Sequence, residues 1–103
     1  MDEKIKKKIE EMINSNEVFL FMKGDPQEPR CGFSARVVYI LNKNKIKFDS
    51  FDVLEDMEIR EGIKIFSEWP TIPQIYVKGN FVGGCDILME LDQQGNLKEE
   101  LGI

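Results

Sequence analysis

The chain has 103 residues, of which 42% are hydrophobic and 32% charged, so we expect residues 1–103 to form one ordinary globular domain. Its formal net charge of −5 argues against nucleic-acid binding, which needs a basic surface. No apolar run approaches the roughly 20 residues that span a bilayer, so no membrane association is expected. The chain contains no histidine, which excludes Cys-His nucleophiles and histidine-ligated metal sites.

The cysteines and the N-terminus bear on the compartment. Cys31 and Cys85 are too few and too far apart for a disulfide framework, so a free-thiol protein of a reducing intracellular compartment is expected. Residues 1–13 are charged and amphipathic and lack an apolar segment, so they do not resemble a secretory signal. They contain several acidic residues and no arginine, which argues against an intact transit peptide.

The first half of the chain alternates helix and strand. Apolar residues at helical spacing predict a helix over residues 1–13, and the continuous apolar run at 17–22 predicts a strand buried on both faces. Residues 23–30 are rich in glycine and proline and are expected to be a loop. A second helix over 35–41 follows, and then a second, slightly irregular strand over 46–51.

The second half begins with a turn and a helix over residues 57–66. The prolines within residues 69–73 exclude a helix there. A strand is predicted over 74–77, a tight turn over 78–80 and a return strand at 81–82, which together make a hairpin.

The last segments complete the fold. Asp86 is predicted to be the N-cap of a helix that ends at Leu91, because its carboxylate can accept a free backbone N–H group. A short final helix is expected over residues 96–101. The order α-β-α-β-α-β-β-α-α, with a right-handed β-α-β crossover and a hairpin, predicts a four-stranded mixed sheet flanked by helices on both faces. This α/β arrangement is the thioredoxin fold.

Cys31 occupies a position that favours a reactive thiol, because it lies between a strand and the start of a helix. Free N–H groups and the positive end of the helix dipole face such a position. Arg30 is adjacent, and Lys23 closes the preceding strand, so we predict a thiol pKa below that of an ordinary cysteine. A glycine- and proline-rich loop is a poor place to bury an inert thiol. Position 34 is serine, so there is no Cys-x-x-Cys pair, and the thiolate needs an external partner.

Cys85 and the segment before residue 74 each allow two interpretations. Cys85 is a small residue packing beneath the site or, less favoured, a resolving thiol that forms a disulfide with Cys31. A cis peptide at Ile72-Pro73 would present backbone groups to a peptide-like ligand opposite the thiol, whereas a trans turn would have no ligand role.

Arg60 and Lys64 also allow two interpretations. They stand one helical turn apart and share a face with Asp56. Spacing alone favours solvated charges that form helix ion pairs over a carboxylate-binding pair near the thiol.

The chain closely resembles the monothiol glutaredoxins of the Cys-Gly-Phe-Ser class, and the match covers residues 19–102. Five motifs in family order carry this resemblance, which is more specific than a lone Cys-Gly-Phe-Ser. They are F-M-K-G at 21–24, P-R-C-G-F-S at 29–34, R-E-G-I-K at 60–64, W-P-T-I-P-Q at 69–74 and G-G-C-D at 83–86.

The resemblance implies two cofactors, glutathione and a [2Fe-2S] cluster. Proteins of this class bind glutathione beside the active cysteine and share the cluster between two protomers. One thiolate per chain cannot satisfy a cluster that takes four ligands, but two Cys31 thiolates and two glutathione thiolates can. A homodimer when cluster-bound and a monomer when apo are therefore expected.

The resemblance also implies residue roles. Cys31 would be the cluster ligand and the redox thiol, with Lys23 close to its thiolate and to glutathione. Arg60 and Lys64 would bind the glycine carboxylate of glutathione, which reverses the preference drawn from spacing.

The remaining roles concern the rest of the tripeptide. Ile72, before Pro73, would pair its backbone with the cysteinyl unit. Cys85 and Asp86 would hold the γ-glutamyl end, with helix N–H groups taking its carboxylate and Asp86 its ammonium. Phe33 would shield the cluster or the tripeptide, and Trp69 would pack under the motif.

One residue departs from the family pattern. Asp25 stands where members often carry threonine or serine, and an acidic group there could weaken the effect of Lys23 on the thiolate. The loop from Lys23 to Cys31 has the length of the monothiol class. In the family this length accompanies poor deglutathionylation and good cluster holding.

The function implied is glutathione-dependent cluster carriage, from an assembly scaffold to apo-client proteins, in the mitochondrion after presequence removal or in the cytosol. One alternative is a monothiol, glutathione-dependent disulfide oxidoreductase with Cys31 as nucleophile, an activity expected to be weak. Another is a regulatory module that pairs with a BolA-like protein, which would have to supply a histidine or cysteine.

Overall fold

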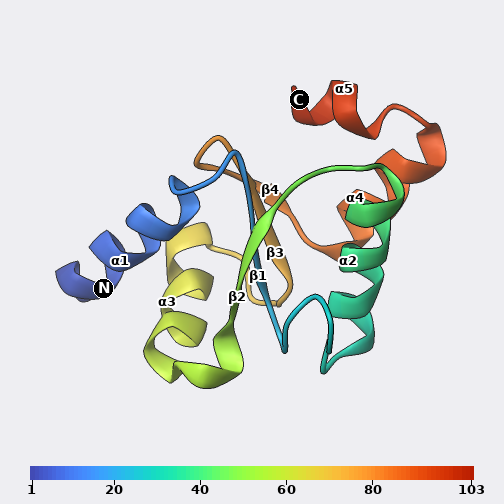
Figure 1. Ribbon diagram of the computed structural model, residues 1–103. Coiled ribbons are helices and arrows are strands. Elements are labelled where there is room, and N and C mark those ends of the chain that lie inside the picture. Colours follow the sequence, from blue (N-terminus) through green and yellow to red (C-terminus); the bar gives the residue numbers. More distant parts are fainter.

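A mixed sheet lies between two helical layers in the computed structural model, which describes residues 1–103. Helices and strands follow the predicted order. They are α1 (Glu3–Ile13), β1 (Val18–Met22), α2 (Gly32–Lys43), β2 (Asp49–Asp52), the 3₁₀ helix η1 (Val53–Glu55), α3 (Met57–Ser67), β3 (Gln74–Val77), β4 (Asn80–Gly83), α4 (Cys85–Gln94) and α5 (Leu97–Leu101). Helices α1 and α3 lie on one side of the sheet, and α2 and α4 on the other (Figure 1). The predicted thioredoxin fold is confirmed.

The four strands are ordered β2-β1-β3-β4. Strand β1 runs parallel to β2, with Phe19 opposite Asp49, and antiparallel to β3, with Phe19 opposite Tyr76. Strands β3 and β4 form the predicted hairpin. All five residues of β1 are buried, which explains why this central strand is a continuous apolar run.

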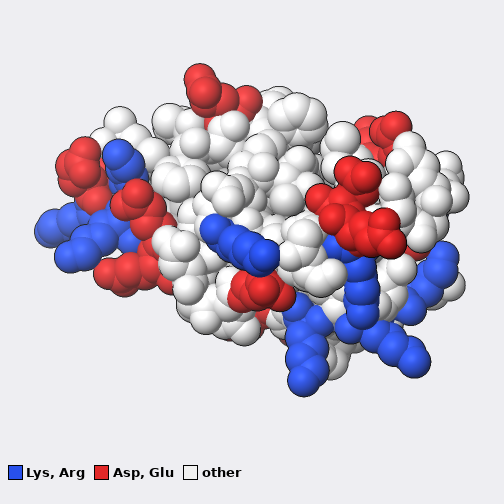
Figure 2. Space-filling view, turned by 90° about the horizontal axis from the view of Figure 1, so that it is seen from above, with Lys and Arg blue, Asp and Glu red and all other residues white.

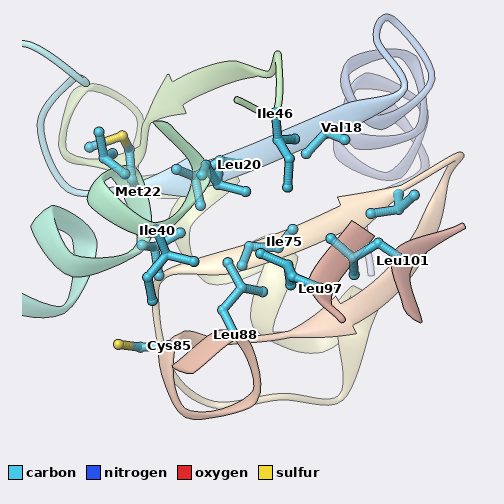
Figure 3. Packing of buried hydrophobic residues seen from close by; sticks show 14 residues of the cluster. Val18, Leu20, Met22, Ile40, Ile46, Ile75, Cys85, Leu88, Leu97 and Leu101 are labelled. Atoms are coloured by element: carbon cyan, nitrogen blue, oxygen red, sulfur yellow. The ribbon is translucent and has the colours of Figure 1, made fainter. Parts of the chain in front are cut away.

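The two faces of β1 contribute to two separate cores, because successive side chains of a strand point to opposite faces. Leu20 packs with residues of α2, α4 and α5, and Figure 3 shows this cluster. Phe21 packs on the other face with residues of α1 and α3, including Ile9 and Ile63. Helices α1 and α3 approach closely at Gly62, where a Cβ atom would lie 2.7 Å from Ile5 Cγ2.

Two elements begin three residues away from the predicted position. Helix α2 begins at residue 32 rather than 35, so Cys31 is its N-cap residue. Strand β2 begins at Asp49, and Ile46 precedes it. The Ile46 N–H donates instead to the Leu41 carbonyl at 2.9 Å, and its side chain is buried against the end of α2. Ile46 therefore closes the end of α2 and does not belong to the strand predicted over residues 46–51.

The prediction that Asp86 caps α4 is wrong. The helix begins at Cys85 and extends to Gln94, with Gly84 as N-cap and no side-chain cap. Asp86 therefore lies inside the first turn, where its carboxylate faces the positive end of the helix dipole. Gly95, in the left-handed region with φ of 77°, ends the helix.

The surface carries charges of both signs. Figure 2 shows acidic and basic side chains side by side on the face seen from above. None of the helices combines the length and the apolar character that crossing a membrane requires.

Candidate functional site

One cleft of about 550 Å³ brings together every residue predicted for the site. It opens around the start of α2, the outer face of α3, the loop before β3 and the start of α4. Its volume is in the range of small-molecule sites. Its lining residues are Lys23, Cys31, Phe33, Arg60, Lys64, Trp69, Pro70, Thr71, Ile72, Pro73, Gly84, Cys85, Asp86 and Ile87.

Cys31 lies at this cleft as a partly exposed free thiol. Partial burial raises its pKa, but this effect is outweighed, and the pKa is lowered from 9.0 as predicted. Hydrogen bonds from the backbone N–H groups of Ser34 and Phe33, a further one from the Ser34 hydroxyl and the charge of Lys23 favour the thiolate. The predicted charge effect thus comes from Lys23, and Arg30 is exposed.

The loop from Lys23 to Arg30 is held by its own backbone. The Arg30 N–H donates to the Lys23 carbonyl at 2.9 Å. One Asp25 carboxylate oxygen accepts from the N–H groups of Gln27 at 2.9 Å and Glu28 at 2.8 Å. Asp25 therefore shapes the loop, and the neighbouring Lys23 still lowers the pKa of Cys31.

The α3 side of the cleft carries two cations, Arg60 and Lys64. Asp56 does not pair with either of them. Its carboxylate caps α3 by accepting from the Ile59 N–H at 3.1 Å and forms an ion pair with Lys8 at 3.3 Å. Lys64 pairs with Glu61 at 3.1 Å, whereas Arg60 forms no ion pair, and its buried Nε has no hydrogen-bond partner. This wall suits an anion, because both cations line the cleft and Arg60 has no ion pair within the chain.

The segment before β3 forms the facing wall. The Ile72-Pro73 peptide is cis, which is the first of the two interpretations that the sequence allowed. The prediction that Trp69 packs under the motif is wrong. Trp69 is 40% exposed and lines the cleft, with its ring 5.9 Å from that of Phe81. Helix α3 ends at Ser67 with Glu68 in the left-handed region, so Trp69 lies outside the helix.

Cys85 lies at the boundary between the core and the cleft, 7% exposed. Figure 3 shows its sulfur pointing outward from the apolar cluster, and it lies 3.7 Å from Met89 Sδ. Burial and the charge of Asp86 raise the pKa of Cys85, so it is the less reactive of two free thiols. The packing interpretation fits this environment, and the resolving role stays an alternative.

Two polar residues that contribute to the site were missed by reasoning from the sequence. Ser34 and Gln74 are both fully buried. Ser34 could have been found, because it is the third residue of a helix capped by Cys31 and its N–H must face the sulfur. Gln74 gave no local signal, since its partners depend on tertiary packing.

The chain has no group of three or more histidine, cysteine, aspartate and glutamate side chains that could hold a metal. A metal cluster with four ligands that uses Cys31 must therefore take at least two of them from outside the chain.

The chain is similar to several known proteins. A monothiol glutaredoxin of Arabidopsis thaliana is 53% identical over 100 residues, covering 97% of this chain, which spans only 20% of that protein's length. An uncharacterized monothiol glutaredoxin of Synechocystis sp. is 52% identical over 103 residues, which make up 100% of this chain and 96% of that protein.

A solved structure and a family model complete the comparison. A buckwheat glutaredoxin in complex with glutathione has a TM-score of 0.83 at 23% identity, covering 99% of this chain and 94% of that chain, which shows a shared fold. The family model described as Glutaredoxin matches residues 18–82. The chain therefore belongs to the glutaredoxin family.

Proposed function

We propose that the cleft binds glutathione, with its thiol beside Cys31. The observation that supports this best is a partly exposed Cys31 thiol with a lowered pKa in the same cleft as two cations, Arg60 and Lys64. The glycine carboxylate would pair with Lys64 and with Arg60, which forms no ion pair within the chain. The glutathione complex of the buckwheat protein, which has the same fold, supports this ligand.

The other end of the tripeptide would lie at the start of α4. Backbone N–H groups there are free of intrahelical partners and suit the γ-glutamyl carboxylate, and the exposed Asp86 carboxylate suits the ammonium group. The backbone of Ile72, before the cis peptide, would pair with the cysteinyl unit. Phe33, which is 64% exposed, would cover the thiols from solvent.

The bound cargo would be a [2Fe-2S] cluster shared by two copies of the chain. Such a cluster takes four thiolates, and each copy supplies Cys31 and one bound glutathione. Two observations favour this over a disulfide mechanism within the chain: residue 34 is a buried serine, and the pKa of Cys85 is raised rather than lowered. The chain would receive the cluster from an assembly scaffold and pass it to apo-proteins, in the cytosol or the mitochondrion.

Anaerobic reconstitution with iron, sulfide and glutathione tests this proposal. We expect a visible cluster spectrum and dimerisation on size exclusion, both absent without glutathione and both lost in Cys31→Ser. A colourless monomer under these conditions would overturn it.

The lowered pKa of Cys31 also favours a second candidate function, reduction of glutathione mixed disulfides. The Cys31 thiolate would attack the glutathione sulfur and release the protein thiol, and a second glutathione would then form oxidised glutathione and regenerate Cys31. Turnover of a glutathionylated peptide that greatly exceeds the uncatalysed rate, with no cluster on reconstitution, would favour this enzyme over the carrier.

A further inference from the structure

Gln74 carries a buried polar side chain that the proposed function leaves unexplained. It is the first residue of β3 and is 0% exposed, and it does not line the cleft. Burying an amide is unfavourable unless its hydrogen bonds are satisfied. The partners of this amide therefore indicate what it does.

The Gln74 amide is fixed at both ends. Its Nε2 donates to the Trp69 carbonyl at 3.0 Å and to the Thr71 carbonyl at 3.2 Å. Its Oε1 accepts from the Tyr76 hydroxyl at 3.1 Å. Two carbonyls can accept only from the NH₂ group, so the network itself determines the orientation of the amide.

The segment that Gln74 holds cannot form all of its backbone hydrogen bonds within itself. Residues 68–73 belong to no helix or strand, and Pro70 and Pro73 have no N–H group to donate. The Gln74 side chain supplies donors for two carbonyls of this segment. A second anchor comes from α3, where the Ser67 hydroxyl donates to the Ile63 carbonyl at 2.7 Å and accepts from the Trp69 N–H at 3.1 Å.

The same segment is one wall of the cleft, since residues 69–73 all line it. We propose that Gln74 is a positioning residue, which holds this wall in its binding geometry without touching the ligand. The inference rests on the proposed function for its ligand, glutathione. A preformed wall avoids the entropic cost of ordering the loop on binding, so the loss of Gln74 should weaken binding.

Two core variants separate positioning from general stability. Gln74→Met keeps the length of the side chain but removes every hydrogen bond to the loop. Tyr76→Phe removes the hydroxyl that reaches Oε1 and also interacts with the Ser67 side chain, and it leaves both contacts of Gln74 with the loop intact. Both variants are expected to lower Tm. A difference between their affinities for glutathione therefore shows the effect of the loop contacts rather than of general stability.

The measurements are the Kd for glutathione by titration calorimetry and acrylamide quenching of the single tryptophan, Trp69, in the ligand-free protein. For Gln74→Met we expect a Kd about tenfold higher and stronger quenching, whereas Tyr76→Phe stays within about twofold of wild type in both. Gln74→Glu carries the test if Gln74→Met does not fold. It keeps an oxygen toward Tyr76 and sets another against the loop carbonyls, so it should behave like Gln74→Met.

Two results overturn the role of Gln74. One is a folded Gln74→Met or Gln74→Glu protein with a glutathione Kd within about twofold of wild type. The other is a Tyr76→Phe protein that is weakened as much as Gln74→Met. If the wild-type chain does not bind glutathione, the proposed function fails. Acrylamide quenching of Trp69 then tests the role of Gln74 by itself. Stronger quenching in the Gln74 variants alone supports this role, and unchanged quenching overturns it.

Discussion

The Ser34 hydroxyl accepts a hydrogen bond from the backbone N–H of Lys23 at 3.1 Å. Because its oxygen accepts there, its proton is available for the Cys31 sulfur, and the hydroxyl and the backbone N–H of Ser34 both lower the pKa of Cys31. One buried side chain thus joins the end of β1 to the first turn of α2 and stabilises the thiolate. It occupies the position where a Cys-x-x-Cys pair has its second thiol.

We predict that Ser34→Ala raises the pKa of Cys31, because the sulfur loses its hydroxyl donor while the backbone donors remain. The variant also leaves the Lys23 N–H unpaired, which costs roughly 1–3 kcal/mol of folding free energy. The pH dependence of iodoacetamide alkylation and urea unfolding measure the two effects. Lys23→Met is the matched comparison and should raise the pKa less. An unchanged alkylation profile in Ser34→Ala would contradict this role.

The thiolate should also make stability depend on pH. The pKa of Cys31 is lowered on folding, so its contribution is fully present above the unfolded value near 9.0 and is lost as pH falls through the folded pKa. Between those two values, wild type should gain stability with rising pH relative to Cys31→Ser. Urea midpoints of both proteins across this window check the sign. A wild-type protein that loses stability relative to Cys31→Ser as the pH rises would contradict the prediction.

Arg60→Met should weaken glutathione binding with little effect on the fold. A charge-assisted hydrogen bond contributes about 1.5–3 kcal/mol, which corresponds to roughly 10- to 150-fold in Kd. Arg60 forms no ion pair within the chain, so its loss breaks none. Titration calorimetry measures the change. Lys8→Met, which removes a cation outside the cleft, serves as the control and should bind normally.

Two glycines close to Cys31 should respond oppositely to alanine. Gly24 has φ of +86°, and a Cβ atom there would lie 2.5 Å from the Glu28 carbonyl oxygen, so Gly24→Ala should destabilise by roughly 2–4 kcal/mol. Gly32 is in the first turn of α2 with nothing within 4 Å of a Cβ atom, so Gly32→Ala should stabilise by up to about 1 kcal/mol. Equal effects in thermal unfolding would show that the loop is not constrained as described.

Cys85→Ala should retain cluster assembly, whereas Cys31→Ser should abolish it. Cys85 is buried and the pKa of its thiol is raised, so it is a poor ligand and a poor nucleophile. Mass mapping of the oxidised wild type complements this comparison. A dominant Cys31–Cys85 disulfide there, or loss of the cluster in Cys85→Ala, would promote the resolving alternative.

Much of the fold was predictable because local patterns and tertiary packing agree. Strand β3 was predicted with its observed bounds, since the prolines before it and the turn after it define it. The prediction failed where a residue type fits two positions equally well. An apolar residue can belong to a strand or close a helix, and an aspartate can cap a helix or lie in its first turn. Ile46 is apolar because it closes α2, and Asp86 lies in the first turn of α4, whose N-cap is Gly84.

The site was predictable in its residues but less so in its contacts. The motifs placed Arg60 and Lys64 at the cleft, although helical spacing alone favoured ion pairs with neighbours. Spacing could not show that Asp56 caps α3 and pairs with Lys8 on α1. The bonds of Gln74 likewise depend on how the loop folds over the sheet, which no local pattern encodes.

The central claim is that Cys31 is one ligand of a cluster completed by glutathione and a second copy of the chain. Native mass spectrometry of the reconstituted protein tests it most directly. The account predicts two chains, one [2Fe-2S] cluster and two glutathione molecules, the four thiolates that such a cluster takes, and only apo monomer for Cys31→Ser. A cluster-bound monomer, a dimer whose cluster lacks glutathione, or a cluster that persists in Cys31→Ser would contradict it.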